Sequence, residues 1–385
     1  MRSSDSAQVD RKQPPWLLPQ YGRASLAELL PSVLAAMAVP GEPNRLGLDP
    51  ARRTCVFLVD GMGLGFLRSH ADHAPFMGTL LPTARELTAG FPTTTATSLG
   101  SLGTGLPPGG HGLLGYQLLV PGDGRLLNLL KWDVPVAPET WQPRQTVFER
   151  AALAGVSTAH ASPEAFRAGG LTRAALRGMR FLAAEAPEDL AARAIEALAV
   201  PEPALVYTYY GGIDRAGHVD GYGSDKHLGQ LAIADQVAAA IARAMPAGTA
   251  LYVTADHGML AVPAERRVDA DNTPELLEGV AALGGEGRAR YVYTVDGAAA
   301  DVLTAWRELL GERAWVLSRD EAVEAGWFGP VAAWAYPRIG DVVVACRDDW
   351  AIVATLRQPL ESRLQGMHGS LTEAELAVPL LTFRA

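Results

Sequence analysis

The sequence predicts an α/β protein with a doubly wound, mostly parallel central sheet, helices on both faces and a small inserted subdomain. Three short apolar, β-branched runs support this prediction, because each reads as a buried strand and leads into a loop with polar residues. They are residues 54–60, 204–210 and 250–254. Helical patterns at residues 188–198 and 225–244 alternate with these runs, and such alternation is typical of doubly wound sheets.

The N-terminal part is expected to differ from the rest of the chain. Residues 1 to about 20 are polar and contain proline, which favours an arm, and residues 25–37 carry apolar side chains at helical spacing. We therefore expect an N-terminal arm and helix over residues 1–45, followed by one large domain over residues 46–385.

Two further segments of this domain have their own patterns. Residues 116–130 predict a hairpin around the turn Pro121-Gly-Asp-Gly124. Residues 288–350 mix strand and helix patterns more loosely, which predicts either a small subdomain, at about residues 262–350, or an extension of the main sheet.

The composition is that of an ordinary globular protein. The 385 residues are 48% hydrophobic and 19% charged, and they contain no run of about 18 apolar residues, so no membrane span is expected. The first residues lack an apolar signal core and a cleavage site, which predicts a cytoplasmic location. Cys55 and Cys346 lie in apolar runs without CxxC spacing, so we expect reduced core cysteines. Oligomeric state has no signature in the sequence.

The charge balance limits the classes of partner. A net charge of −9 argues against nonspecific nucleic-acid binding, which needs a basic face. If such an acidic protein acts on phosphate esters, positive charge must be supplied locally, and bound metal ions are one means of doing so.

One hydroxyl-rich stretch stands out, Phe91-Pro-Thr-Thr-Thr-Ala-Thr-Ser98. A proline followed by threonines and then by small and apolar residues predicts a helix N-terminus, where hydroxyls cap free amides and the exposed N–H groups attract anions. Thr95 is the candidate functional residue of this turn. The alternative is that these threonines only cap and pack.

Seven polar side chains end strand-like runs or lie in glycine-rich segments. They are Asp60, Thr95, Asp214, His218, Asp256, His257 and His368. Three acids, three imidazoles and one hydroxyl suit two zinc-like ions, since two ions about 4 Å apart can clamp both oxygens of an in-line phosphoryl transfer. Each residue also has a plain structural alternative, such as a helix cap, a capped turn or an exposed loop. No ligand role is assigned to the other histidines, which are His70, His73, His111, His160 and His227.

At these motifs the chain resembles the alkaline phosphatase superfamily, and most closely its branch of type I phosphodiesterases and nucleotide pyrophosphatases. The similar segments cover roughly residues 54–385 and follow the family's order. They are Val59-Asp-Gly-Met62, Phe91-Pro-Thr-Thr-Thr95 with Thr104-Gly-Leu106 and His111-Gly112, Asp214-Arg-Ala-Gly-His218, Thr254-Ala-Asp-His-Gly-Met259, and Met367-His-Gly-Ser370 with Val378-Pro-Leu380.

The resemblance implies an alkaline-phosphatase-like catalytic domain that hydrolyses phosphodiester or pyrophosphate bonds of a small substrate, a nucleotide among the candidates. It implies two divalent ions, with Zn²⁺ expected and Mn²⁺ as the alternative, and Thr95 as a nucleophile that forms a phosphothreonine. One ion would be held by Asp60, Thr95, Asp256 and His257. The other would be held by Asp214, His218 and His368.

The chain departs from the branch just after Thr95. An aromatic residue, proline and asparagine commonly follow there, whereas this chain has Ala96-Thr-Ser98 and no asparagine before Asn128. A base-stacking wall is therefore not expected at this place. We hypothesise that the phenol of Tyr116 donates the hydrogen bond to a nonbridging phosphoryl oxygen that the missing asparagine would provide.

Other functions remain open at this point. A phosphomonoesterase or phosphonate hydrolase with the same bimetal core would need an extra cation, for which Lys131 and Arg338 are candidates. The sulfatase branch is not favoured, because neither cysteine lies in its modification motif. A dinucleotide-binding oxidoreductase would use the glycines of residues 61–65, but their spacing is GxGxG and Asp60 would repel a pyrophosphate. The complete set of ligands argues against a scaffold without turnover.

Overall fold

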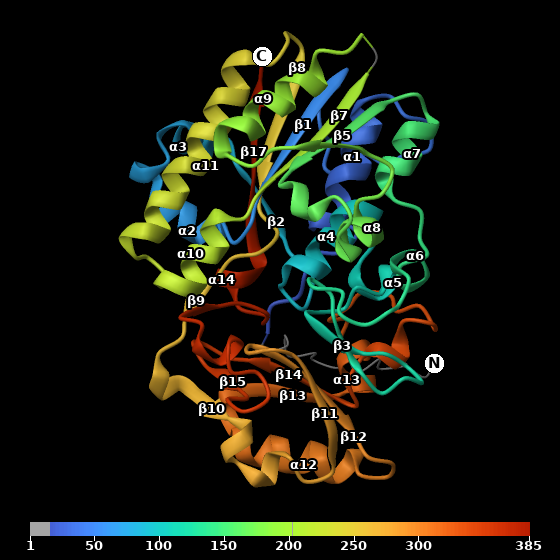
Figure 1. The fold of residues 1–385 in the computed structure, drawn as a ribbon, viewed down its shortest axis with the longest axis vertical. Coiled ribbons are helices and arrows are strands. Elements are labelled where there is room, and N and C mark those ends of the chain that lie inside the picture. The colour runs from blue at the N-terminus through green and yellow to red at the C-terminus, as the bar shows by residue number, and fades with distance from the viewer. Residues whose placement is uncertain (1–15, 202) are drawn as a thin grey trace, which may run out of the picture.

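A seven-stranded sheet forms the larger half of the molecule, seen in the upper part of Figure 1. The computed structural model describes residues 16–201 and 203–385, so the first fifteen residues of the expected arm lie outside the described part. The strands in spatial order are β2 (Arg85–Thr88), β17 (Ala377–Arg384), β8 (Thr249–Thr254), β1 (Arg53–Val59), β7 (Ala204–Tyr210), β5 (Ser157–Ser162) and β6 (Arg180–Ala183).

The central part of this sheet is parallel. Strand β1 pairs in parallel with β7 and β8, and β5 pairs in parallel with β6 and β7, whereas β17 runs antiparallel to both of its neighbours. Because β1 is buried on both faces, its residues are almost all apolar and β-branched or bulky. The predicted fold class, a doubly wound and mostly parallel sheet, is confirmed.

Helices cover both faces of the sheet, with α9 and α11 on one side and α1, α4 and α7 on the other (Figure 1). The helices up to α7 are α1 (Leu29–Ala36), α2 (Leu64–Ser69), α3 (Pro75–Leu80), α4 (Thr95–Thr104), α5 (Pro108–His111), α6 (Pro138–Trp141) and α7 (Val147–Leu153). The later ones are α8 (Gly170–Ala175), α9 (Pro187–Leu198), α10 (Gly212–Asp220), α11 (Asp225–Ala244), α12 (Ala299–Leu310), α13 (Arg319–Glu324) and α14 (Glu373–Leu376).

A second sheet lies in the lower part of Figure 1. Its four antiparallel strands are β11 (Val280–Glu286), β12 (Ala289–Thr294), β14 (Val342–Cys346) and β13 (Ala314–Ser318). Helix α12 packs against it around the buried Trp306, which belongs to a separate hydrophobic cluster. In the part of the chain that the structure describes, these four strands form a sheet of their own and do not pair with the seven-stranded sheet, so this segment does not extend the main sheet.

Shorter strand pairs connect the two halves. The predicted hairpin is confirmed as β3 (Gln117–Leu119) paired antiparallel with β4 (Leu126–Asn128). Strand β16 (Gly366–Met367) pairs with β9 (Leu260–Ala261), and β10 (Arg267–Asp269) pairs with β15 (Ala351–Val353).

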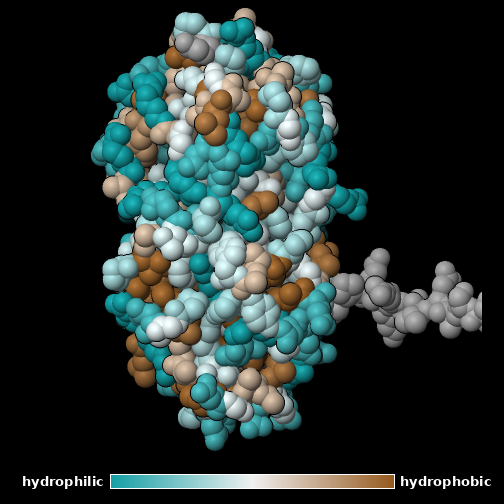
Figure 2. All heavy atoms as spheres, turned by 90° about the vertical axis from the view of Figure 1, so that its right-hand side faces the viewer, coloured by the Kyte–Doolittle hydropathy of each residue, from teal (hydrophilic) through white to brown (hydrophobic). Residues whose placement is uncertain are grey.

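The surface and the cysteines agree with the composition. No helix in the described part of the chain is both long and apolar enough to cross a membrane. On the face drawn in Figure 2, apolar side chains lie in small groups between hydrophilic ones. Cys55 and Cys346 are both free and buried, as expected.

Candidate active site

Three neighbouring strands deliver polar residues to one edge of the main sheet. Asp60 follows β1, Asp214 and His218 lie on α10 after β7, and Asp256 with His257 follows β8. The parallel register aligns the carboxyl ends of these strands, so the loops after them meet at the same edge, where α/β proteins bind ligands. The four-residue spacing of Asp214 and His218 places both side chains on one face of α10.

The loops approach each other closely. The amide of Asp214 donates to the carbonyl of Asp60 at 3.1 Å. Gly61, which lies between β1 and α2, has a φ of +76°, and a Cβ at this position would lie 3.0 Å from Asp214 Cα. A side chain at Gly61 would therefore strain the backbone and push the loops of Asp60 and Asp214 apart.

Thr95 and His368 reach the same point from other elements. Thr95 is the first residue of α4, within the stretch for which a helix N-terminus was predicted, and His368 follows β16. We expected threonine hydroxyls to cap the free amides of this helix. That expectation is wrong at the N-cap residue, Thr94, whose side chain accepts no hydrogen bond from the helix amides. Instead, the hydroxyl of Thr93 donates to the carbonyl of Ser370 at 2.9 Å and accepts from the amide of Gly369 at 3.0 Å, which ties the α4 turn to the His368 loop.

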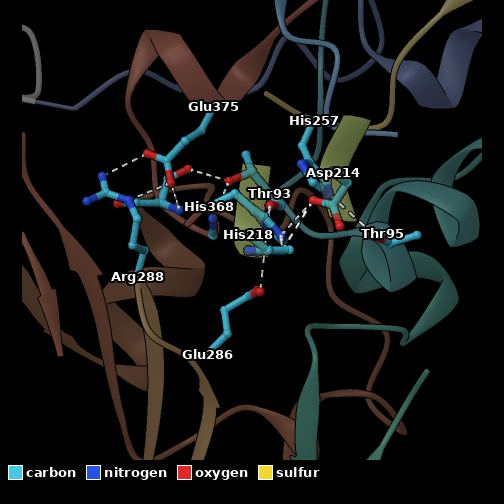
Figure 3. A network of polar contacts seen from close by, with 12 residues as sticks. Thr93, Thr95, Asp214, His218, His257, Glu286, Arg288, His368 and Glu375 are labelled. Carbon is cyan, nitrogen blue, oxygen red and sulfur yellow. Dashed lines mark hydrogen bonds and ion pairs between the residues drawn. The ribbon is translucent and has the colours of Figure 1, made fainter. Parts of the chain in front are cut away.

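The structure brings all seven predicted side chains into one cluster, part of which is shown in Figure 3. Thr95 Oγ1 lies 3.4 Å from both Asp60 Oδ2 and His257 Nε2. His257 Nε2 is 3.5 Å from Asp256 Oδ2, and its ring stacks on that of His368 with 3.8 Å between centroids.

The remaining contacts of the cluster join Asp214 to two imidazoles. Asp214 Oδ1 lies 3.2 Å from His218 Nε2 and 3.6 Å from His368 Nε2. The two imidazole nitrogens are themselves only 3.1 Å apart. Side chains separated by up to about 300 positions in the chain therefore converge.

Two groups of ligand atoms can be separated within this cluster. The candidate ligand atoms of Asp60, Asp256 and His257 all lie within 4.8 Å of one another, and so do those of Asp214, His257 and His368. His257 belongs to both groups, so the two candidate metal sites adjoin each other.

The orientation of the three imidazoles suits metal binding. Nδ1 of His218, His257 and His368 each faces a backbone carbonyl oxygen, at 2.7, 3.0 and 2.8 Å respectively. Such a bond fixes the ring and leaves Nε2 free as a ligand, which is the usual arrangement around metal-bound histidines. In all three residues, Nε2 is the atom that faces the cluster.

The charges of the cluster are unbalanced without a cation. Asp60 and Asp256 are buried and Asp214 lies half-buried beside them, and among the described residues no lysine or arginine forms an ion pair with these three acids. Burial and the charge of Asp256 raise the pKa of Asp60, and burial with the charge of Asp214 raises the pKa of Asp256 to about 7. Burial also acts against the charge of Asp214, but the adjacent His218 holds its pKa below the usual range.

Unpartnered carboxylate oxygens support the same conclusion. In the described part of the chain, Asp60 Oδ1, Asp214 Oδ1 and Asp256 Oδ2 are buried without a hydrogen-bond partner. Buried polar atoms are normally satisfied, and orphaned carboxylate oxygens next to imidazole nitrogens are what divalent metal sites offer. The residues present therefore fit two divalent cations.

A cavity of about 300 Å³ opens in front of Thr95 and His368. Tyr116 and Lys131 line it together with Glu286, and the phenol of Tyr116 donates to Glu361 Oε1 at 3.1 Å. Arg338, the other candidate cation, is not part of this cavity. It is buried elsewhere, where it donates to the carbonyls of Gly112 and Trp141.

Sequence reasoning missed several residues around the cluster. The Tyr209 hydroxyl donates to Asp60, and Ser98 Oγ donates to the Asp256 carbonyl at 2.7 Å. Ser98 lies three positions after Thr95 on the same helix face, so helical spacing was an available signal. Glu286 Oε2 lies 3.6 Å from His368 Nδ1, but it comes from the second sheet, and no local pattern indicates it.

A buried ion pair between Arg288 and Glu375 lies beside the loops that carry His257 and His368. Glu375 accepts from Arg288 Nε at 2.7 Å and from the Ser370 amide at 2.9 Å, and its own carbonyl accepts from the Gly258 amide at 2.9 Å (Figure 3 shows the side chains). Ser370 and Gly258 are near neighbours of His368 and His257. This one glutamate therefore connects two ligand loops to the second sheet.

Comparison with known families gives a match over most of the chain. The model of the family described as type I phosphodiesterase / nucleotide pyrophosphatase matches residues 54–371. No curated protein sequence matches the chain.

Solved structures share the fold at low sequence identity. Murine ectonucleotide pyrophosphatase / phosphodiesterase 5 superposes with a TM-score of 0.69 at 19% identity, over 85% of this chain and 87% of that chain. An inactive form of the same murine protein, in complex with AMP, gives a TM-score of 0.68 at 18% identity, over 85% and 87% of the two chains. Phosphonoacetate hydrolase from Sinorhizobium meliloti 1021, in complex with phosphonoformate, gives 0.66 at 19% identity, over 87% and 90%.

Because carboxylates are crowded in this cluster, we expect Asp256→Asn to change the stability of the metal-free protein. The pKa of Asp256 is raised in the folded state, so folding becomes less favourable as pH rises from about 4 to about 7, and the penalty persists above that range. The amide keeps an oxygen for the Gly61 and His257 amides. At pH 8 we expect the variant to be more stable than the chelator-treated parent by about 1–3 kcal/mol in urea unfolding, and the gain to vanish near pH 4.

Asp341→Asn is the matched control, because Asp341 pairs with Arg319 at 2.7 Å. This control is expected to lower stability at pH 8. An Asp256→Asn protein that is less stable than its parent at pH 8 would contradict the charge repulsion.

Proposed function

Since this chain belongs to the type I phosphodiesterase / nucleotide pyrophosphatase family, we propose that it hydrolyses phosphodiester or pyrophosphate bonds with Thr95 as the nucleophile. The observation that supports this role best is the position of Thr95, which lines a cavity and whose Oγ1 lies 3.4 Å from both Asp60 Oδ2 and His257 Nε2. A hydroxyl at a helix N-terminus beside candidate metal ligands is suited to attack a bound phosphoryl group.

The proposed ligand sets start from the two groups in the cluster, with His218 taking the place of His257 in the second, because His218 Nε2 lies 3.2 Å from Asp214 Oδ1 and 3.1 Å from His368 Nε2. Asp60, Asp256 and His257, with Thr95, would hold one ion, and Asp214, His218 and His368 would hold the other. We propose zinc, because imidazole nitrogen and carboxylate oxygen without thiolate suit Zn²⁺, and Mn²⁺ is the alternative. When bound, the two ions would lower the pKa of the threonine hydroxyl and neutralise negative charge on the phosphoryl oxygens.

The proposed reaction has two displacements. Thr95 Oγ1 forms a bond to phosphorus as the bond to the leaving oxygen breaks, and the leaving group departs as an alcohol or a phosphate. Water then attacks the phosphothreonine from the vacated side, which releases the second product and restores the hydroxyl. First-turn amides of α4 have no partner within the helix and would stabilise the phosphoryl oxygens.

Tyr116 is proposed to donate a hydrogen bond to a nonbridging phosphoryl oxygen. Its side chain lines the cavity that Thr95 also lines, and its present acceptor, Glu361 Oε1, is 3.1 Å away. A rotation of the hydroxyl hydrogen towards a bound substrate would exchange one acceptor for another.

A phosphomonoesterase or phosphonate hydrolase activity is the second candidate, and one observation favours it. Lys131 lines the same cavity as Thr95, and its side chain is exposed and forms no ion pair with a described residue. A cation in this position would neutralise the additional negative charge of a phosphate monoester or a phosphonate. The phosphonoacetate hydrolase that shares the fold is a neighbour of this kind.

Thr95→Ala tests the nucleophile. We expect kcat for bis(4-nitrophenyl) phosphate to fall by about 10³-fold or more, because no other hydroxyl is proposed to form the covalent intermediate. Thr97→Ala is the matched control. Thr97 lies on the same helix, is fully buried and has no hydrogen-bond partner for its hydroxyl among the described residues.

Turnover by Thr97→Ala is expected to stay within a few-fold of the parent. Acid quench during turnover followed by peptide mass spectrometry should locate a phosphoryl group on Thr95. Equal losses in the two variants, or a phosphoryl group on another residue, would refute the assignment.

Removing the metal and adding it back tests whether turnover and stability require bound metal ions. Element analysis of protein purified without chelator should find about two zinc-like ions per chain. Chelation is expected to abolish turnover and to lower the unfolding midpoint, since a ligand at 100 times its Kd stabilises a folded protein by about 2.7 kcal/mol. Zinc should restore both properties, with manganese compared in parallel. Full turnover by protein shown to be metal-free would contradict the proposal.

A two-substrate comparison tests Tyr116 and Lys131. Tyr116→Phe should lower kcat/KM for bis(4-nitrophenyl) phosphate by about tenfold, the value of one hydrogen bond to a charged group. Lys131→Ala should lower kcat/KM for 4-nitrophenyl phosphate more than for the diester. Lys226→Ala, which removes an exposed lysine paired with Asp220, is the control for lysine loss. Unchanged diester turnover in Tyr116→Phe would remove its proposed role.

A further inference from the structure

Helix α14 lies directly behind the candidate metal cluster, although none of its residues is a proposed ligand. The carbonyl oxygen of Ala374 is so close to Gly258 that a Cβ on this glycine would lie 1.9 Å from it. A Cβ on Gly63 would lie 3.1 Å from the same oxygen and 2.8 Å from Gly258 Cα. Gly258 follows His257, and Gly63 lies in the loop after Asp60. The backbone of α14 therefore packs against two of the loops that carry proposed ligands.

Glu375, on this helix, is fully buried and uses both of its carboxylate oxygens (Figure 3). Oε1 accepts from Arg288 Nε at 2.7 Å and from the Ser370 amide at 2.9 Å, and Oε2 accepts from Arg288 Nη2 at 2.9 Å. The carbonyl of Glu375 accepts from the Gly258 amide, also at 2.9 Å. Ser370 lies two positions after His368. One residue therefore holds the loops of both histidines that stack in the cluster.

Arg288 anchors this glutamate to the second sheet. It lies in the turn between β11 and β12, is fully buried, and donates to the carbonyls of Trp350 and Asp348 as well as to Glu375. A guanidinium that pairs with a carboxylate through two parallel hydrogen bonds fixes the direction of the carboxylate as well as its distance. The position of Glu375 is therefore set from the second sheet, independently of the ligand loops.

The two loops that Glu375 holds carry ligands of different candidate ions. His257 is proposed to hold one ion and His368 the other, and their rings stack at 3.8 Å between centroids. The relative position of these imidazoles determines how far apart the ions lie, and in-line phosphoryl transfer needs about 4 Å between them. Before metal binds, repulsion between the carboxylates favours a wider spacing of the loops. The hydrogen bonds of Glu375 act against this spreading.

We propose that Glu375 is a positioning residue that holds His257 and His368 at the spacing that two adjacent divalent ions require, and that it thereby sets the affinity of both metal sites. The inference rests on the proposed function, because it takes the two histidines as ligands of two ions. Glu375 does not line the cavity in front of Thr95, so it acts through the loops and not on the substrate. Groups that orient metal ligands typically contribute about 10–100-fold to metal affinity.

A purely structural role of this ion pair leads to a different expectation. Removal of one partner of a buried ion pair leaves a buried charge unpaired, which lowers the free energy of unfolding. The Kd of zinc for molecules that are already folded does not depend on that free energy. Zinc binding measured on folded protein therefore separates positioning of the ligands from general stabilisation of the fold.

Zinc binding to Glu375→Gln tests the proposal. The amide keeps the size of the side chain and one acceptor oxygen for the Ser370 amide, but it loses the two-bond ion pair with Arg288. Zinc Kd values are measured by competition with a chromophoric chelator, at a temperature at which circular dichroism shows parent and variant to be folded. We expect both ions to bind about 10–100-fold more weakly to the variant than to the parent.

Asp341→Asn is the matched control. Asp341 also pairs with an arginine, Arg319, at 2.7 Å, and the other hydrogen bonds of these two side chains go to Thr294, Ile339 and Gly340, outside the ligand loops. This variant is expected to be less stable than the parent and to bind zinc with the Kd of the parent.

Arg288→Lys provides a second test, which does not depend on the folding of Glu375→Gln. Lysine keeps a positive charge beside Glu375 but cannot form the two parallel bonds. We expect folded Arg288→Lys protein to bind zinc more weakly than the parent, because the direction of the glutamate is no longer fixed.

The outcomes separate the inference from the proposed function. Folded Glu375→Gln or Arg288→Lys protein that binds zinc with the Kd of the parent would overturn the inference and leave Thr95 as the nucleophile. An equal loss of affinity in Asp341→Asn would overturn it as well. Turnover retained by Thr95→Ala would refute the nucleophile without affecting the ratios of the zinc Kd values. A parent that binds no zinc would overturn both.

Discussion

The structure depends on one electrostatic constraint, the crowding of three carboxylates, two buried and one half-buried, in a single cluster that no lysine or arginine of the described chain balances. Asp60, Asp214 and Asp256 repel one another there, and their unpartnered oxygens face imidazole nitrogens. In low dielectric this arrangement is costly unless cations are bound. The same geometry that makes the metal-free cluster unfavourable therefore makes it a candidate binding site for divalent ions, and bound cations would allow a protein of net charge −9 to hold a phosphate ester.

The surrounding fold keeps these groups in place. The parallel register of β1, β7 and β8 aligns three ligand loops, and Gly61 lets two of them approach. The turn before Thr95 is tied to the His368 loop through Thr93, and Glu375 joins the His257 and His368 loops to Arg288, in the turn between β11 and β12 of the second sheet. The second sheet thus supports the candidate site as well as forming one wall of its main cavity.

Two cavities lie beside Thr95, one of about 300 Å³ and one of about 190 Å³, and they differ in charge. The larger one carries Lys131, Glu286 and Glu361, so it suits polar or charged groups. Apart from Asp60, Thr95 and Asp214, the smaller one is lined by apolar side chains and by uncharged polar groups, among them the neutral imidazole of His160. An ester has two substituents on phosphorus, and such a pair of cavities provides a different environment for each. Selectivity for substrate is therefore expected to come from side chains outside the metal cluster.

The sequence by itself determined the layered α/β fold and the seven polar residues of the candidate site, because strand ends and glycine-rich segments are local patterns that parallel topology brings together. It also predicted a helix N-terminus in the stretch that contains Thr95, and the hairpin of β3 and β4. Only the tertiary structure decided that Lys131 lies beside Thr95 while Arg338 does not, and that Glu286 reaches His368 from the second sheet. That His160 lines a cavity beside Thr95 also emerged only from the tertiary structure. These contacts join residues far apart in the chain through packing between separate elements, and no local periodicity encodes such proximity.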